Sequence, residues 1–273
     1  MNRNIEETPI ALVGAGNLAT NLAVALHRKG FRIVQVYSRT CESAQALAQA
    51  VGTGYTTEPE DLTHEAQLYI VSLKDSALTG LLPRLTAGRE HALWVHTAGS
   101  IPMSIWQGYA PRHGVLYPMQ TFSKQREADF SQIPIFLESS SPEALRLLTA
   151  IASTLSEQVR EASSEQRKSL HLAAVFACNF TNHMYALAAA LLQKHGLSFD
   201  AMLPLIDETA RKVHQLDPHD AQTGPAVRYD TNVIHDHLDM LADEPEIQQL
   251  YRLLSEDIHR MAMVPSPIPQ KND

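Results

Sequence analysis

The stretch Gly14-Ala15-Gly16-Asn17-Leu18-Ala19 places small residues at a spacing suited to a dinucleotide. In the pattern G-x-G-x-x-G/A, the first glycine permits a tight turn, the second lets the main chain approach a pyrophosphate, and the third small residue lets a helix pack on a strand. We expect Gly14, Gly16, Asn17 and Leu18 to contact that pyrophosphate, because unpaired N–H groups at a helix N-terminus favour an anion. A strand pattern before the turn and a helix pattern after it favour this interpretation over a glycine-rich turn without a ligand.

The end of the next predicted strand, residues 31–38, indicates which dinucleotide fits. An NAD site has Asp or Glu there for the ribose 2'-hydroxyl, whereas a 2'-phosphate needs a cation. Here Ser38, Arg39 and Thr40 end the strand, and the first acid is Glu42. A guanidinium pairs well with phosphate, and hydroxyl groups add donors. The sequence therefore predicts NADP(H) as the cofactor, with an ordinary surface arginine as the alternative for Arg39.

Three further strand patterns, within 66–75, 91–100 and 112–122, continue the alternation of strands and helices. Ligands of open α/β sheets bind beyond the carboxyl ends of the strands, so we expect these ends to surround the nicotinamide and the substrate. The residues predicted to bind the cofactor there are Leu73, Lys74, His96, Thr97 and Ala98. Those predicted to bind the substrate are Gln120 and Thr121.

A candidate proton donor follows on a long predicted helix, which a capping box at Ser163 and Gln166 opens. His171 has a side chain suited to general acid catalysis near neutral pH. Asn182 follows it by about three helical turns, so both could project from one face. A histidine on an apolar helix can equally be a satisfied core residue, and that alternative stays open.

The pattern predicts an α/β dinucleotide-binding domain with a mostly parallel sheet over 1–160 and an all-α domain over 161–265. The Pro-rich residues 266–273 are predicted to be a flexible tail. Residues 172–192 are apolar on nearly every face, so that helix must be buried all round. A partner subunit would supply the cover, and we expect a homodimer through the helical domain.

Composition excludes several other classes of protein. The 273 residues carry a formal net charge of −8, which argues against nucleic-acid and anionic-membrane partners. The N-terminus is polar where a signal peptide would be apolar, and the longest apolar run has Asn179, Asn182 and His183 at its middle. Two cysteines are too few for a disulfide framework or a thiolate zinc site, so we expect a cytoplasmic protein without a structural metal.

The predicted turn over residues 217–228 is polar and holds two more candidates for substrate binding, Thr223 and Arg228. They could form a clamp contributed across a dimer, or a helix-capping loop with an Arg228–Asp230 pair; both alternatives stay open. His235 and His237 are two residues apart on a helix and point in different directions, so no metal site is expected there.

Several motifs carry a family resemblance: VGAGNLATNLAVAL, VHTAGS, LYPMQTFS, HLAAVFACNFTNHM and TGPAVRYD. They resemble pyrroline-5-carboxylate reductases and the 6-phosphogluconate and β-hydroxyacid dehydrogenase superfamily. They are more similar to Rossmann-like bacterial proteins with a C-terminal DUF2520 domain, described as NADP- or F420-dependent oxidoreductases. The resemblance covers residues 8 to about 263. It implies a Rossmann domain, an all-α dimerising domain and a cleft between them, and it leaves F420 open as a partner in hydride exchange.

The resemblance also implies a catalytic lysine on the interdomain helix, which Lys168 matches. In β-hydroxyacid dehydrogenases an asparagine follows four residues later, but here that residue is Leu172. Most relatives in the closer group have histidine where this chain has Tyr117. Two functions therefore stay open. One is an NADP(H)-dependent oxidoreductase that moves hydride to or from a small carbonyl, imine or hydroxy acid in the interdomain cleft; the other is a non-catalytic NADP(H)-binding sensor or assembly protein.

Overall fold

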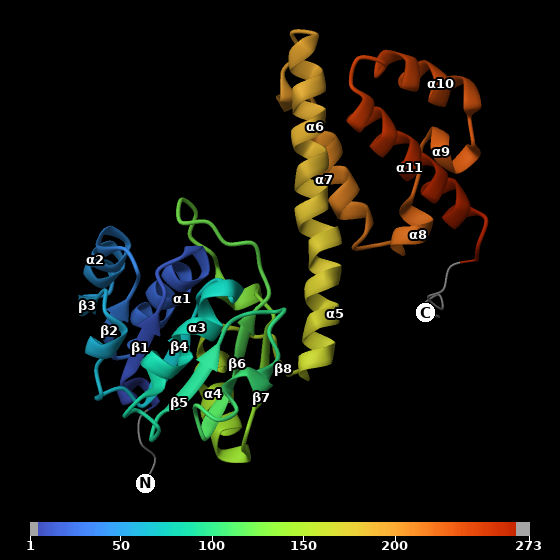
Figure 1. Ribbon diagram of the computed structural model, residues 1–273. Helices are drawn as coiled ribbons and strands as arrows, with labels where there is room; N and C mark the ends of the chain where they lie inside the picture. The colour runs from blue at the N-terminus through green and yellow to red at the C-terminus, as the bar shows by residue number, and fades with distance from the viewer. Residues whose placement is uncertain (1–4, 266–273) are drawn as a thin grey trace. The chain divides into compact units, whose positions relative to one another are not determined.

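The computed structural model describes residues 5–265, which form two compact units, 5–183 and 184–265. The first unit contains an eight-stranded sheet and its helices, and the second is helical (Figure 1). The predicted fold class, an α/β Rossmann domain followed by an all-α region, is confirmed. The boundary between the compact units lies inside a helix, well beyond residue 160. The predicted flexible tail, 266–273, lies outside the described residues.

The sheet has the strand order β3-β2-β1-β4-β5-β6-β7-β8. Every neighbouring pair is parallel except β6 and β7, which are antiparallel. The strands are β1 Ile10–Val13, β2 Ile33–Tyr37, β3 Gly54–Thr56, β4 Leu68–Val71, β5 Leu93–His96, β6 Arg112–Pro118, β7 Ile135–Ser139 and β8 Val159–Glu161. The strand order changes direction at β1, where β2 and β4 flank it, and this is where an open α/β sheet binds its ligand.

Two hydrophobic clusters cover the two faces of the sheet because successive strand residues point to opposite sides. Ile10 and Leu12 of β1 belong to one cluster, and Ala11 and Val13 belong to the other. The helices of the first unit are α1 Asn17–Arg28, α2 Cys41–Ala50, α3 Asp75–Thr86, α4 Pro142–Leu155 and α5 Ser164–Ala174. Helices α1, α2 and α4 pack on the first cluster and α3 on the second, so the sheet is buried on both sides. Its short 3-10 helices are η1 Ile5–Glu7, η2 Pro59–Asp61, η3 Met103–Trp106 and η4 Phe130–Gln132.

The long predicted helix forms with the predicted capping box: Gln166 N–H donates to Ser163 Oγ, and Ser163 N–H donates to Gln166 Oε1. After α5 the helix continues through a π-helical segment, η5 Val175–Phe180, into α6 Thr181–Lys194. Among residues 5–265, the helix Ser164–Lys194 is the one that is long and apolar enough to cross a membrane. The mean hydropathy of its best 18-residue window is, however, only 1.2. None of that window is buried. The rest of this chain therefore does not bury the helix over residues 172–192, which was predicted to be buried on all sides.

Beyond α6, the described part of the second unit contains a 3-10 helix and five α-helices, of which α8 and α9 are short. The elements are η6 Phe199–Met202, α7 Leu203–Lys212, α8 Pro218–Ala221, α9 Pro225–Arg228, α10 Thr231–Met240 and α11 Pro245–Ala262.

Candidate functional site

The glycine turn after β1 has the geometry that a pyrophosphate requires. Gly14 has φ = +120°, and a Cβ built there would lie 2.2 Å from the carbonyl oxygen of Ser72, so only glycine fits. Gly16 is the N-cap of α1 without a side-chain cap, and a Cβ built on it meets nothing within 4 Å. The first N–H groups of α1 have no partner within the helix, and its first turn carries no acid. The space over Gly16 and these amides therefore suits an anion.

The end of β2 suits a 2'-phosphate. Arg39 and Thr40 are exposed, and Ser38 is nearly buried beside them. Within residues 5–265 the Arg39 side chain makes no hydrogen bond or ion pair, and Thr40 is the N-cap of α2 without using its hydroxyl as a cap. The cation and the hydroxyl group are therefore available to a ligand.

A cavity of about 740 Å³ lies within the first unit, beyond the carboxyl ends of β4, β5 and β6. It extends from the start of α1 to the face of α5 and η5. Its lining includes eight of the predicted site residues: Asn17, Leu18, Leu73, Thr97, Ala98, Gln120, Thr121 and His171. The cavity therefore lies where the strand-end argument placed the nicotinamide and the substrate.

The other predicted residues lie elsewhere. Gly14, Gly16, Ser38, Arg39 and Thr40 form the turn and the β2 end described above, outside the cavity lining. Lys74 and Lys168 are exposed, and neither lines the cavity. Thr223 and Arg228 belong to the second unit.

Asn182 does not line the cavity, whereas Asn179 does. In an uninterrupted α-helix, at about 100° per residue, Asn182 would lie within about 20° of the direction of His171. The π segment adds one residue to a turn and sets every later residue back by one position. Asn179 then takes the direction near His171, and Asn182 turns about 80° away. The π segment could not be foreseen from the apolar pattern of residues 172–192.

Tyr117 and His171 form a pair of titratable side chains that line the cavity. The Tyr117 hydroxyl lies 3.5 Å from His171 Nδ1, and the two rings meet edge to face. Burial raises the pKa of Tyr117, so its hydroxyl stays protonated at neutral pH. A Cβ added to Gly99 would lie 2.9 Å from both His171 Nδ1 and Tyr117 Cζ. The glycine at this position therefore lets the two side chains meet.

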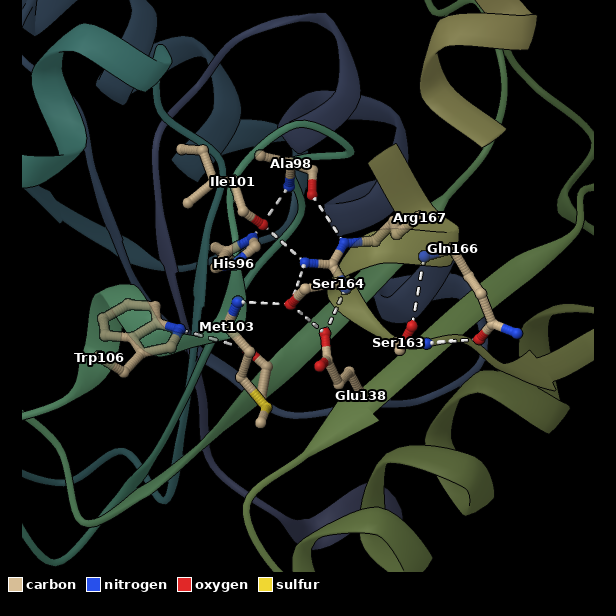
Figure 2. A network of polar contacts seen from close by, with 11 residues as sticks. His96, Ala98, Ile101, Met103, Trp106, Glu138, Ser163, Ser164, Gln166 and Arg167 are labelled. Carbon is tan, nitrogen blue, oxygen red and sulfur yellow. Dashed lines mark hydrogen bonds and ion pairs between the residues drawn. The ribbon is translucent and has the colours of Figure 1, made fainter. Parts of the chain in front are cut away.

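A buried network anchors α5, which carries His171, to the sheet (Figure 2). Arg167 is 1 % exposed and pairs with Glu138 of β7 at 2.5 Å. Its guanidinium also donates to the carbonyl oxygens of Ala98, at 3.3 Å, and Ile101, at 2.6 Å. Ser164 donates to Glu138 and accepts from the amide of Met103. The network fixes both the loop after β5 and the first turn of α5, and Arg167 lies about one helical turn before His171.

His96, predicted to bind the cofactor, is 1 % exposed and does not line the cavity. Its ring stacks on Trp106, and its Nδ1 accepts from the amide of Ala98. Burial, with the nearby charge of Arg167, lowers the pKa of His96 to about 3. His96 is therefore neutral near pH 7 and holds the turn that carries Thr97 and Ala98 into the cavity.

The side chain of Asn17, another predicted cofactor contact, donates to the carbonyl oxygen of Phe122. Asn21, one turn later, bonds to the carbonyl oxygen of Ser123 and to the amide of Ala128. These contacts hold the loop after β6, with Gln120 and Thr121, against α1. Asn21 was missed from the sequence because its partners are more than 100 residues away.

In the second unit, the turn with Thr223 and Arg228 contains Gly224 at φ = +113° and Tyr229 at φ = +51°. Tyr229 stacks on His259, with ring centroids 4.2 Å apart. No Arg228–Asp230 ion pair occurs in the described chain. Nor do three His, Cys, Asp or Glu side chains among residues 5–265 gather as a metal site would require.

Two family models match the chain. The model described as "NADP oxidoreductase coenzyme F420-dependent" matches residues 9–98, which include the glycine turn and Arg39. The model of the domain of unknown function DUF2520 matches residues 133–258. No curated protein matches this sequence.

Solved structures extend the comparison. A protein from Bacteroides fragilis, whose assignment as an NADP oxidoreductase is itself a proposal, is 68 % identical. The match covers 94 % of this chain and 100 % of that one, with a TM-score of 0.92. An imine reductase from Streptomyces aurantiacus shares the fold at 17 % identity, covering 92 % and 93 % of the two chains with a TM-score of 0.66. A pyrroline-5-carboxylate reductase from Streptococcus pyogenes does so at 14 % identity, covering 93 % and 99 % with a TM-score of 0.64.

These matches confirm the predicted family resemblance and NADP as the cofactor, and they support an NAD(P)-dependent oxidoreductase. In this chain the match to the NADP oxidoreductase model precedes the match to the DUF2520 model, and the chain belongs to the family of the Bacteroides fragilis protein.

Proposed function

We propose that the protein is an NADP(H)-dependent oxidoreductase that moves hydride to or from a small carbonyl, imine or hydroxy acid. The observation that carries the proposal is the cavity, which joins the first residues of α1 to the Tyr117–His171 pair within one unit. A dinucleotide on the glycine turn would extend its reactive end toward the carboxyl ends of β4 and β5. NADP(H) supplies the hydride when bound.

The side chains of the cavity supply the proton. The protonated Tyr117 hydroxyl is suited to donate to His171 Nδ1, which leaves Nε2 as the imidazole nitrogen that meets the substrate. His171 can then give a proton to the substrate oxygen or nitrogen as hydride reaches carbon. Thr97, Gln120 and Asn179 are suited to orient the substrate by hydrogen bonds.

The placement of Lys168 favours a second candidate, a non-catalytic NADP(H) sensor or assembly protein. Lys168 does not line the cavity, and the expected asparagine partner is Leu172. The proton-donor lysine of the dehydrogenase superfamily therefore has no counterpart in this cavity. The sensor would bind cofactor but reduce no substrate.

Replacing Tyr117 with phenylalanine tests the proton route. We expect kcat for NADPH-dependent reduction to fall at least tenfold, because His171 loses the hydroxyl that orients it. NADPH affinity should not change. The measurement is steady-state kinetics with a fluorescence titration of NADPH, and Tyr109→Phe, at a half-exposed tyrosine outside the cavity, is the control. Unchanged kcat in Tyr117→Phe would remove Tyr117 from the mechanism.

Replacing Arg39 with alanine tests the contact with the 2'-phosphate. We expect the Kd of NADPH to rise about tenfold to a hundredfold, since a charge-assisted hydrogen bond contributes about 1.5–3 kcal/mol. The Kd of NADH should stay the same. Arg32→Ala removes another exposed arginine, paired with Glu65, and is the control. Equal affinity of the wild type for both cofactors would contradict the assignment of Arg39.

We also propose a homodimer in which a second subunit covers the apolar helix. Leu172, Phe176 and Phe180 are 61 %, 62 % and 50 % exposed, and the two phenylalanine rings pack edge to face. Exposed apolar residues clustered in this way mark an interaction surface. Light scattering at micromolar concentration should give twice the 30.2 kDa chain mass. Phe176→Asp should shift the protein toward the monomer, and a monomeric wild type would rule the dimer out.

A further inference from the structure

The charges around the cavity restrict its substrate. Among the lining residues, all within residues 5–183, Asp75 is the one carboxylate, and no lysine or arginine takes part. Ser100 donates a hydrogen bond to the Asp75 carboxylate at 2.5 Å. Most of the other lining side chains are apolar or small, among them Leu18, Met119, Ala173 and Ala177.

The arginine and lysine residues closest to this lining in the sequence are either held in a buried network or lie outside the lining. The Arg167 guanidinium is buried and donates to Glu138 and to the carbonyl oxygens of Ala98 and Ile101. It cannot turn to a ligand without breaking that network. Lys74, Lys124 and Lys168 each lie within two residues of a lining residue in sequence, but all three side chains are exposed and lie outside the lining.

We propose that the cavity selects an imine or its protonated iminium form, without a carboxylate group, over oxo acids and hydroxy acids. A substrate carboxylate that left water and met no cation in the cavity would lose several kcal/mol of hydration free energy. A cationic C=N group would instead be attracted by the Asp75 carboxylate. The inference rests on the proposed function, whose substrate class it narrows.

The chemistry balances without a further reagent. The carbon of the C=N bond accepts a hydride from reduced nicotinamide, which is oxidised to NADP⁺. The π electrons move to nitrogen, so an iminium ion becomes a neutral amine. A neutral imine needs one more proton on nitrogen, and the Tyr117–His171 pair is placed to supply it.

Two five-membered rings that differ by one carboxylate form the kinetic test: 2-methyl-1-pyrroline and 1-pyrroline-5-carboxylate. With NADPH, we expect kcat/KM at least tenfold higher for the ring without the carboxylate. Asp75→Asn should raise KM for 2-methyl-1-pyrroline about fivefold to tenfold, while Asp239→Asn, at an exposed aspartate in the second unit, should leave it unchanged. Higher kcat/KM for the carboxylated ring would overturn the proposal. In that case, loss of the preference for the carboxylated ring in Arg228→Ala would identify Arg228 as part of the substrate clamp that the sequence suggested.

An equilibrium measurement separates this inference from the proposed function, because it needs no turnover. Calorimetry should show that the NADP⁺ complex binds 2-methylpyrrolidine, which is a cation, at least tenfold more tightly than 2-tetrahydrofuroate, an anion of similar size. Tighter binding of the anion, or binding of neither compound, overturns the inference. Selective binding of the cation with no reduction of any imine or ketone would support the charge selection and contradict the oxidoreductase.

Discussion

Replacing Arg167 with leucine is expected to lower the free energy of unfolding of the first unit by about 3 kcal/mol or more. The substitution leaves the Glu138 carboxylate without its cation and deprives the carbonyl oxygens of Ala98 and Ile101 of their buried donor. Urea unfolding followed by circular dichroism measures the change. Glu138→Gln is the milder second variant, because it keeps the shape of the side chain and removes only its charge.

The Arg112–Glu143 pair provides the matched control. It joins the same types of side chain in the same unit, but 39 % and 75 % of their surfaces are exposed. Arg112→Leu should therefore cost less than about 1 kcal/mol, the usual upper value for a surface ion pair. Equal effects of the two substitutions would mean that the buried network does not anchor α5.

Replacing Gly14 with alanine is expected to have the other large effect. The new Cβ would lie 2.2 Å from the Ser72 carbonyl oxygen, at a φ of +120° that side chains rarely adopt. Either the turn or the end of β4 must move, and both border the proposed dinucleotide site. We expect NADPH binding to be lost and the melting temperature to fall by several degrees, equivalent to at least about 2 kcal/mol.

Gly16→Ala separates binding from folding. Its φ is −78° and the added methyl group meets no neighbour, so the free energy of unfolding should hardly change. The methyl group would, however, occupy the space through which a pyrophosphate approaches the main chain. A weaker NADPH complex with an unchanged melting temperature is the expected result. Normal NADPH affinity in both glycine variants would place the cofactor elsewhere.

The parts of the fold predicted correctly from the sequence are those that local patterns determine. The glycine turn, the main strands and the Ser163–Gln166 capping box each lie within a few consecutive residues, and all are confirmed. The short β3 strand was missed because Gly54–Thr56 is too short for a strand pattern. Antiparallel pairing of β6 with β7 was also not predicted, because pairing depends on contacts distant in sequence.

The candidate site was only partly predictable for the same reason. Strand ends placed Thr97, Ala98, Gln120 and Thr121 on the cavity, because the carboxyl ends of parallel strands share one edge. The same argument could not show that the His96 side chain turns inward to Trp106. Arg167 looked like one more charged helix residue; its partner Glu138 lies 29 residues away, so no local pattern marked the pair.

The central claim is that NADP(H) bound at the glycine turn exchanges hydride with a small substrate in this cavity. The most direct measurement is mass spectrometry of the amine formed from 2-methyl-1-pyrroline with NADPH deuterated at C4 of the nicotinamide, in separate runs for each face. We predict one deuterium in the product from one of the two labelled cofactors, and none with Gly14→Ala. Product without deuterium from either cofactor, or no product from any imine or ketone while NADPH remains bound, would contradict the claim.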